Sequence, residues 1–207
     1  MIMKITAIKP RRRFFSALFL DGEFAVNIDT ETLMKSGFRQ GSDITDEELH
    51  ALIQSSEQRR ANEKALYLLE HRSHSKKELV DKIRRTASRE AAEAAADRME
   101  ELGLVDDEDY ARRYATELLH RKGYAASRTV YELVQKGIDK EFAEELVEEL
   151  APDPQEKIRQ VIERKYPGCG TDEKITRRAM AALQRLGYRY DDIRRAMRDY
   201  VDELEIE

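Results

Sequence analysis

The sequence predicts a mainly α-helical protein built from three tandem three-helix repeats in an elongated curved array, with a small N-terminal β-hairpin element. Strand-like alternation of apolar and polar residues is confined to residues 1–60. Beyond residue 60, apolar positions follow helical spacing and recur roughly every 50 residues, as in repeat proteins. Only 41% of the residues are hydrophobic, 38% are charged and tryptophan is absent, which disfavours one deep core.

The charge balance and composition limit the class of protein. The 207 residues include 37 Lys and Arg against 42 Asp and Glu, a formal charge of −5, which argues against a tight general DNA binder. Apolar runs fall far short of the ~20 residues of a membrane span, and the N-terminus lacks the pattern of a secretory signal. The single cysteine makes neither an internal disulfide nor a multi-cysteine metal site. We therefore expect a cytoplasmic protein without membrane contact.

Residues 1–60 are predicted as an N-terminal extension of strands followed by a linking helix. Strands are expected at 4–9, 14–20 and 23–27, where β-branched and aromatic residues alternate with polar ones. Asp21-Gly22 joins the last two, because this dipeptide tolerates the positive φ angles of a type I′ hairpin turn. A short helix at 31–36 precedes Thr45 and Glu48, which form a capping box at the start of a longer helix.

Three repeats are predicted over residues 61–105, 106–150 and 151–207. The first helix of each repeat carries two apolar residues one turn apart. These pairs are Ala61 and Ala65, Ala111 and Ala115, and Ile158 and Ile162. Because each repeat offers only a narrow apolar stripe, we expect it to pack on a neighbour.

The second and third helices repeat as well. A capping box of Ser75 and Glu78 opens the second helix of the first repeat. The core positions of the second helices are expected at Val80 and Ile83, Val130 and Leu133, and Met180 and Leu183. Small residues follow these helices at Ala87, Gly137 and Gly187, which suits a left-handed cap. The third helices are expected to bury Ala92, Ala95, Met99 and Leu102, then Ala143, Val147 and Leu150, then Ile193, Met197 and Tyr200.

Three segments of the first two repeats form a specific set when taken in order. They are Arg72-Ser-His-Ser-Lys-Lys-Glu-Leu79, Gly103-Leu-Val-Asp-Asp-Glu-Asp-Tyr-Ala111 and Glu132-Leu-Val-Gln-Lys-Gly-Ile138. This set resembles the RecX family, regulators of the RecA recombinase. The resemblance covers the first two repeats; the third matches by pattern, and the strands around Leu20-Asp-Gly-Glu-Phe24 resemble the extension of some members.

The resemblance implies a non-catalytic protein that lies along the groove of the RecA filament on single-stranded DNA. Such a protein usually damps the ATPase and strand exchange of RecA, and so acts in recombination, DNA repair and the SOS response. The implied partners are the RecA filament and single-stranded DNA, contacted directly or through the filament. No cofactor and no metal are implied, and a monomer is expected.

Ten basic residues are candidates for contacts with DNA or the filament. They lie on and after the second helix of the first repeat and along the second repeat: Lys76, Lys77, Lys82, Arg84, Arg85, Arg112, Arg113, Arg121, Lys122 and Arg128. Acids collect elsewhere, notably over residues 141–149, so a basic edge toward phosphates and an acidic face toward protein are expected. The alternative is a set of solvated helix faces with pairs such as Glu78–Lys82 and Asp81–Arg85.

Several other residues have structural explanations that compete with functional ones. Asp106 and Asp107 are expected to cap the next helix. His71 and His74 are too few for a zinc site, so a turn or cap role is expected. Cys169 is expected to be exposed, with no neighbour that activates its thiol. Four tyrosines lie among arginines and either stack on bases or pack in the core: Tyr110, Tyr114, Tyr124 and Tyr131.

Two alternatives to a filament regulator stay open. No nucleophile elbow, His-Glu-x-x-His motif or dinucleotide-binding fingerprint is present, so an enzyme is not expected. A tandem helical DNA-binding protein that reads base edges is one alternative, although asparagine occurs only at Asn27 and Asn62. A helical scaffold that binds only protein, through the acidic face of the second repeat, is the other.

Overall fold

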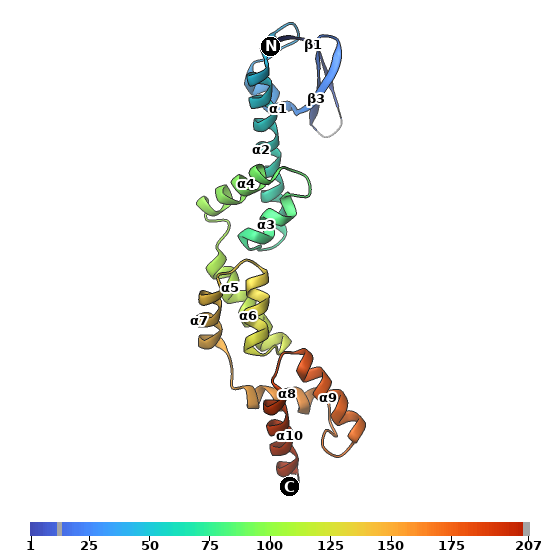
Figure 1. Cartoon of the computed structure of the whole chain (residues 1–207), viewed down its shortest axis with the longest axis vertical. Coiled ribbons are helices and arrows are strands. Elements are labelled where there is room, and N and C mark those ends of the chain that lie inside the picture. The colour runs from blue at the N-terminus through green and yellow to red at the C-terminus, as the bar shows by residue number, and fades with distance from the viewer. Residues whose placement is uncertain (12–13, 205–207) are drawn as a thin grey trace. The chain divides into compact units, whose positions relative to one another are not determined.

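The mainly helical fold predicted from the sequence is confirmed in the computed structural model, which describes residues 1–11 and 14–204 (Figure 1). The chain divides into two units, Met1–Asp106 and the part from Asp107 onward. The first unit contains β1 (Ile2–Pro10), β2 (Phe15–Leu20), β3 (Glu23–Asp29), α1 (Thr30–Ser36), β4 (Asp43–Thr45), α2 (Asp46–His71), α3 (Lys76–Ile83) and α4 (Arg89–Glu101). The second contains α5 (Asp107–Thr116), the π-helix η1 (Glu117–Lys122), α6 (Ala126–Gln135), α7 (Lys140–Leu150), α8 (Pro154–Lys165), α9 (Glu173–Arg185) and α10 (Tyr190–Leu204).

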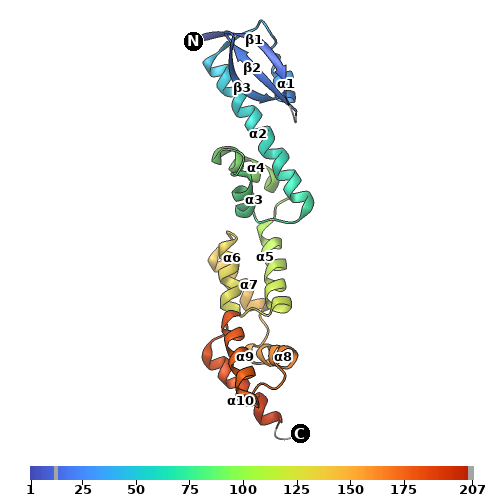
Figure 2. The ribbon, with the colours of Figure 1, turned by 90° about the vertical axis from the view of Figure 1, so that its right-hand side faces the viewer.

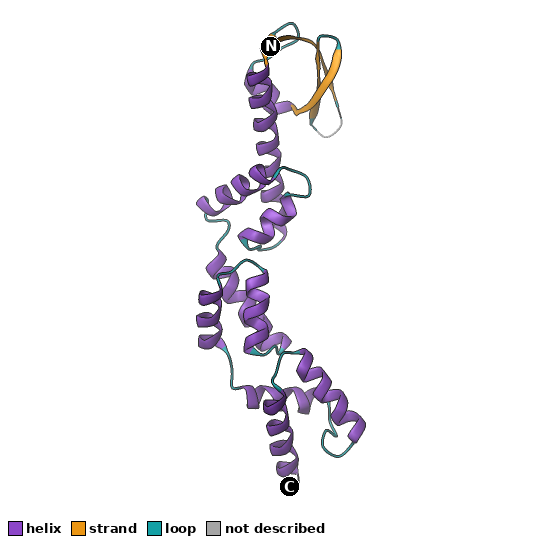
Figure 3. Cartoon of the chain, viewed as in Figure 1, coloured by secondary structure: helices purple, strands orange, loops and turns teal. Residues whose placement is uncertain are grey.

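The strands form a four-stranded antiparallel sheet in the order β3-β2-β1-β4. Figure 2 labels β1, β2 and β3, and Figure 3 shows strands in orange. The predicted turn between β2 and β3 is confirmed, because Asp21 and Gly22 have φ angles of 49° and 94°. The β element is nevertheless larger than the predicted hairpin. β4 pairs with the outer edge of β1, Ile2 opposite Thr45, and its three residues are too few for an alternation pattern to reveal a strand.

One continuous helix, α2, links the sheet to the first three-helix core. It begins at the predicted capping box: Thr45 Oγ1 accepts a hydrogen bond from the Glu48 N–H at 3.2 Å, and the Glu48 carboxylate accepts one from the Thr45 N–H at 2.8 Å. Leu52 packs in the sheet core, whereas Ala61 and Ala65 pack in the core with α3 and α4. The boundary expected at residue 60 therefore lies inside a helix of 26 residues.

Each three-helix repeat has an apolar core of its own. The register of 50 residues holds in the second helices α3, α6 and α9, where two equivalent positions have 0% exposure in every repeat. The buried sets are Leu79, Thr129 and Ala179, and Ile83, Leu133 and Leu183. The predicted repeat thus corresponds to a repeated pattern of burial.

Two details of the repeat differ from the prediction. The left-handed cap occurs at Gly137 and Gly187, with φ angles of 88° and 95°, but not at Ala87. The physical reason is that α3 ends at Ile83, about half a turn before the equivalent point of α6 and α9, and the chain then turns differently. Leu102, expected in the core, is 50% exposed because it follows the end of α4.

Within the second unit, the turn after α9 packs closely on the start of α6. The Tyr188 hydroxyl donates a hydrogen bond to the Gly123 carbonyl at 3.1 Å. Gly187 lies so near α6 that a Cβ atom there would be 2.6 Å from the Cβ of Arg128. Glycine is therefore required at this position both for its positive φ and for its size.

We expect Gly187→Ala to destabilise the second unit by about 2–4 kcal/mol, because it combines a strained φ with a steric clash. Gly123→Ala is the matched control: its φ is 74°, but a Cβ would meet only Val161 Cγ2 at an ordinary 3.7 Å. The control is expected to lose only about 1–2 kcal/mol. Urea unfolding followed by circular dichroism measures both, and equal losses would contradict the steric account.

Candidate interface for nucleic acid and protein

The first cluster of predicted contact residues lies on α3 and the turn that follows it. The Ser75 hydroxyl caps α3 by accepting a hydrogen bond from the Glu78 N–H at 3.2 Å. Leu79 and Ile83 point into the core, which orients the charged residues of α3 toward the surface. Lys77, Arg84 and Arg85 are exposed, and Lys76 and Lys82 are partly exposed.

Lys76 ties α3 to α4. Its ammonium group lies 2.7 Å from the Asp97 carboxylate and 2.6 Å from the Glu100 carboxylate. These two partners raise the pKa of Lys76 far above its usual range. A phosphate would have to displace both carboxylates, so this lysine has first a structural role.

Lys82, Arg84 and Arg85 form no ion pair within the described part of the chain. The expected pair of Glu78 with Lys82 is absent there, because the Glu78 carboxylate accepts two hydrogen bonds from Arg72, at 3.0 and 2.8 Å. The negative end of the α3 dipole stabilises cations at this place. These three side chains can meet a phosphate without breaking an existing ion pair.

In the second unit, Arg112 is already held by an acid. Its guanidinium group donates to both carboxylate oxygens of Glu149 on α7, at 2.9 and 3.2 Å. This contact lowers the pKa of Glu149 and raises that of Arg112. The predicted basic edge and acidic face therefore meet at this pair.

Three more candidates of the second unit are paired within their own helical segments. Arg113 pairs with Asp109, and Arg121 pairs with Glu117. Lys122 lies 3.4 Å from the same Glu117 carboxylate. Pairs this exposed contribute little to stability, so a phosphate can replace the acid at small cost.

Arg128 belongs to the junction between α6 and α9. It donates a hydrogen bond to the Arg185 carbonyl and lies 3.3 Å from the Glu132 carboxylate. Its guanidinium carbon lies 4.6 Å from the centroid of the Tyr124 ring. Of the ten candidates, Arg128 therefore has the clearest structural role.

The predicted tyrosines divide between core and surface. Tyr110 is only 8% exposed, whereas Tyr131 is 61% exposed. Tyr114 is partly buried, which raises its pKa, and the ammonium groups of Lys122 and Lys136 lie 5.8 and 5.9 Å from its ring centroid. The π-helical turn η1 carries Lys122 toward this ring; such turns are frequent at functional sites and have no pattern in the sequence that predicts them.

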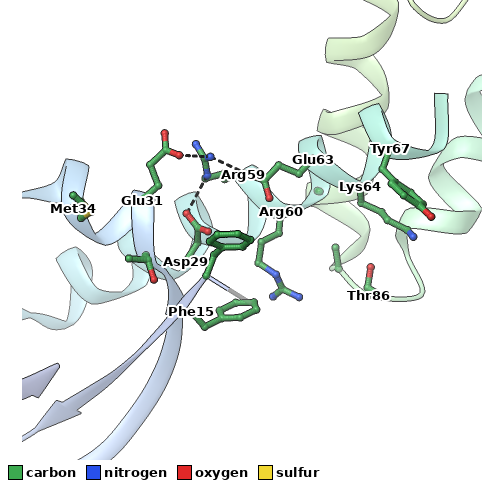
Figure 4. A pocket seen from close by; sticks show the side chains of 14 residues that line it. Phe15, Asp29, Glu31, Met34, Arg59, Arg60, Glu63, Lys64, Tyr67 and Thr86 are labelled. Atoms are coloured by element: carbon green, nitrogen blue, oxygen red, sulfur yellow. Dashed lines mark hydrogen bonds and ion pairs between the residues drawn. The ribbon is translucent and has the colours of Figure 1, made fainter. Parts of the chain in front are cut away.

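A pocket of about 950 Å³ in the first unit was not predicted (Figure 4). It lies between the start of β2, the β3–α1 junction, α2 and the loop before α4. Arg60 and Lys64 of α2 line it together with the rings of Phe15 and Tyr67. The only trace in the sequence is a pair of cations one helical turn apart, followed by an aromatic residue three positions later.

His71 and His74 differ in environment. His74 is 3% exposed, and its Nδ1 lies 2.9 Å from the Arg72 carbonyl oxygen. Burial, and then the charge of Arg72, lower the pKa of His74. His71 is exposed, with Nδ1 2.7 Å from the Tyr67 carbonyl oxygen. Both contacts are to backbone near the end of α2, and the described residues hold no cluster of three or more metal-ligating side chains.

Cys169 is buried, with 1% exposure, so the prediction of an exposed thiol was wrong. Gly168 and Gly170 have φ angles of 89° and 96°. They turn the chain so that the thiol lies in the apolar core formed by α8, α9 and α10. Burial raises the pKa of this thiol.

Among the helices that the structure describes, none combines the length and the apolar character needed to cross a membrane.

The environment of His74 predicts a pH dependence of stability. Because the folded pKa is lowered, the neutral ring stabilises the fold above the unfolded pKa of ~6.5, and that stability is lost as the pH falls below this value. We expect the melting temperature of the wild type to fall more between pH 7.5 and 5.5 than that of His74→Asn. His71→Asn, at an exposed site, is expected to follow the wild type; parallel profiles for all three would contradict this account.

Two family models match the second unit. The model described as the second three-helix domain of RecX matches residues 106–147, and that of the third three-helix domain matches residues 152–197. The chain is 30% identical over 183 residues to the regulatory protein RecX of Caldanaerobacter subterraneus, which covers 87% of this chain and 90% of that protein. It is 26% identical over 212 residues to the regulatory protein RecX of Bacillus subtilis, covering 100% of this chain and 78% of that protein.

Solved structures share the fold. A crystal structure of regulatory protein RecX matches with a TM-score of 0.60 at 17% identity, covering 92% of this chain and 96% of that one. The crystal structure of RecX from Lactobacillus salivarius matches with a TM-score of 0.55 at 21% identity, covering 73% and 98%. The 30% identity to a relative over most of both chains, together with the two family models, shows that the chain belongs to the RecX family of regulatory proteins, which are not enzymes.

Proposed function

We propose that this protein binds the RecA filament on single-stranded DNA and damps its ATPase and strand exchange, and thereby recombination and DNA repair. The observation that carries the proposal is the family membership, which one relative supports over 87% of the chain. The three-helix domains also support the proposal. Their apolar cores are small, so many of their charged side chains lie on the surface, where a macromolecular partner can contact them.

Binding along the filament groove would let successive domains contact neighbouring RecA subunits. Several weak contacts then add through effective concentration, so that no single contact needs high affinity. The division into repeats at 61–105, 106–150 and 151–207, their elongated curved array and a monomeric state all stay predictions.

The contacts we favour lie at the end of α3. Lys82, Arg84 and Arg85 can bind phosphate without losing an ion pair, and each such contact would release counterions and make binding salt-dependent. Lys77 of the same helix is exposed and is kept as a contact. Arg112, Arg113, Arg121 and Lys122 of the second unit remain candidates that must first exchange an acid for a phosphate.

The proposal is tested with the single-strand-dependent ATPase of RecA from the same source. The protein is titrated at two salt concentrations, and the protein alone is tested on the same DNA. A fall in ATPase at amounts well below one per RecA subunit is the expected result. An unchanged ATPase together with tight, sequence-selective duplex binding by the protein alone would instead favour a DNA reader.

The role of the α3 cations is tested by charge reversal. We expect Arg84→Glu/Arg85→Glu to need at least tenfold more protein for the same fall in ATPase, because two contacts become repulsive, with the difference shrinking at high salt. Arg89→Glu/Arg98→Glu is the matched control, since both arginines lie on α4 of the same unit and are paired with Glu93 and Glu101. Equal inhibition by the two double variants would exclude the end of α3 as the contact.

A further inference from the structure

The pocket of the first unit has two chemically different ends (Figure 4). One end, the ion-paired end, consists of Asp29, Glu31, Arg59 and Glu63. The other, the aromatic–cation end, consists of Phe15, Arg60, Lys64 and Tyr67. Both ends are lined from α2, so a bound molecule would lie along this helix.

The charges of the ion-paired end are satisfied internally. Arg59 Nε lies 3.0 Å from the Asp29 carboxylate, and Arg59 Nη2 lies 2.9 Å from Glu63 and also pairs with Glu31. Glu31 has a second cation, Lys35, at 2.8 Å, and the pKa of Glu31 is lowered as a result. Arg59 and Lys35 therefore offset two of the three negative charges, which weakens the repulsion that this end exerts on a nearby anion.

At the aromatic–cation end, each cationic side chain lies against an aromatic ring. The Arg60 guanidinium carbon lies 4.8 Å from the Phe15 ring centroid, and Lys64 Nζ lies 4.9 Å from that of Tyr67. Over residues 1–11 and 14–204, neither cation forms an ion pair. Figure 4 shows Arg60 and Lys64 extending to the same side of α2, with the two rings beside them. The His71 ring centroid lies 4.4 Å from that of Tyr67, but Tyr67 is 54% exposed, so part of its ring is accessible.

We propose that the aromatic–cation end binds a short stretch of single-stranded DNA. Bases would stack on the rings of Tyr67 and Phe15, and phosphates would meet Lys64 and Arg60. Alternation of aromatic and basic side chains along a groove is how proteins hold single strands without sequence preference. The volume of about 950 Å³ is near the upper end of ordinary ligand sites, which span about 300–1,000 Å³.

Single-stranded DNA would contact both the aromatic rings and the cations of this end, whereas a peptide would contact only one of the two. An apolar peptide would use the rings and leave two cations desolvated without partners, and an acidic peptide would use the cations and leave the rings unstacked. The choice of DNA also rests on the proposed function, which brings the chain to a filament on single-stranded DNA. The site would add a nucleic-acid contact on α2, separate from the candidate contacts on α3 and in the second unit.

The test uses the full-length protein without RecA and a fluorescein-labelled oligothymidylate, with affinity measured by fluorescence anisotropy. Tyr67→Ala is expected to weaken binding about tenfold, because one stacked base loses its platform. Tyr67→Phe, which keeps the ring, is expected to bind within about twofold of the wild type. Lys64→Gln should lower the salt slope by about 0.7, the value for one phosphate contact on a single strand.

A second measurement locates the strand. An oligonucleotide that carries 5-iodouracil is cross-linked by light, and the modified peptide is identified by mass spectrometry. Cross-links on the peptides of Phe15 or Tyr67 support the site. Equal affinities of Tyr67→Ala and Tyr67→Phe, or cross-links confined to α3 and the second unit, would overturn it, and so would a wild type that binds no oligonucleotide.

The outcomes separate this inference from the proposed function. If the wild type leaves the RecA ATPase unchanged, the proposed function fails whatever the oligonucleotide shows. If the wild type and Tyr67→Ala damp the ATPase equally and bind the oligonucleotide equally, only the pocket assignment fails.

Discussion

The first unit depends on one helix that serves two apolar cores. The first half of α2 packs Leu52 against the sheet, and its second half packs Ala61 and Ala65 against α3 and α4. Each core is small, and small cores supply little net stability on their own. Because α2 is continuous, its side chains have a fixed spacing along both cores, and α2 thus places Arg60 and Lys64 one turn apart in the pocket.

A second constraint comes from the abundance of charge. Small helical cores cannot bury 79 charged side chains out of 207 residues, so many of these side chains lie on the surface, where a number of them form ion pairs. Arg112 with Glu149 links two helices, and Lys76 joins two acids of α4. Net charge is therefore a poor guide to contact residues here, and the cations left without an ion pair in the described chain carry more information.

Much of the fold was predictable because the sequence repeats. Periodic apolar positions located the helices, and the burial of Ile83, Leu133 and Leu183 shows that the repeat reflects packing. The Asp21-Gly22 turn and the capping box of Thr45 were predictable because their chemistry is local. β4, the π-helical turn and the burial of Cys169 were not, since they depend on pairing or packing between segments that no local pattern reports. For the same reason the ten basic candidates could be listed from the sequence, whereas their intramolecular partners could not.

The way the sheet is joined to the repeats has an evolutionary consequence. The N-terminal extension and the first three-helix domain are joined by a helix and not by a loop. This helix is α2, the first helix of the domain, which continues at its N-terminal end into the extension. A gene that loses the extension by truncation within α2 would still encode Ala61 and Ala65 on a helix able to pack against α3 and α4. Gain or loss of the sheet is thus an event that the remaining domain can tolerate, and members of one lineage can differ in this appendage while keeping the same helical modules.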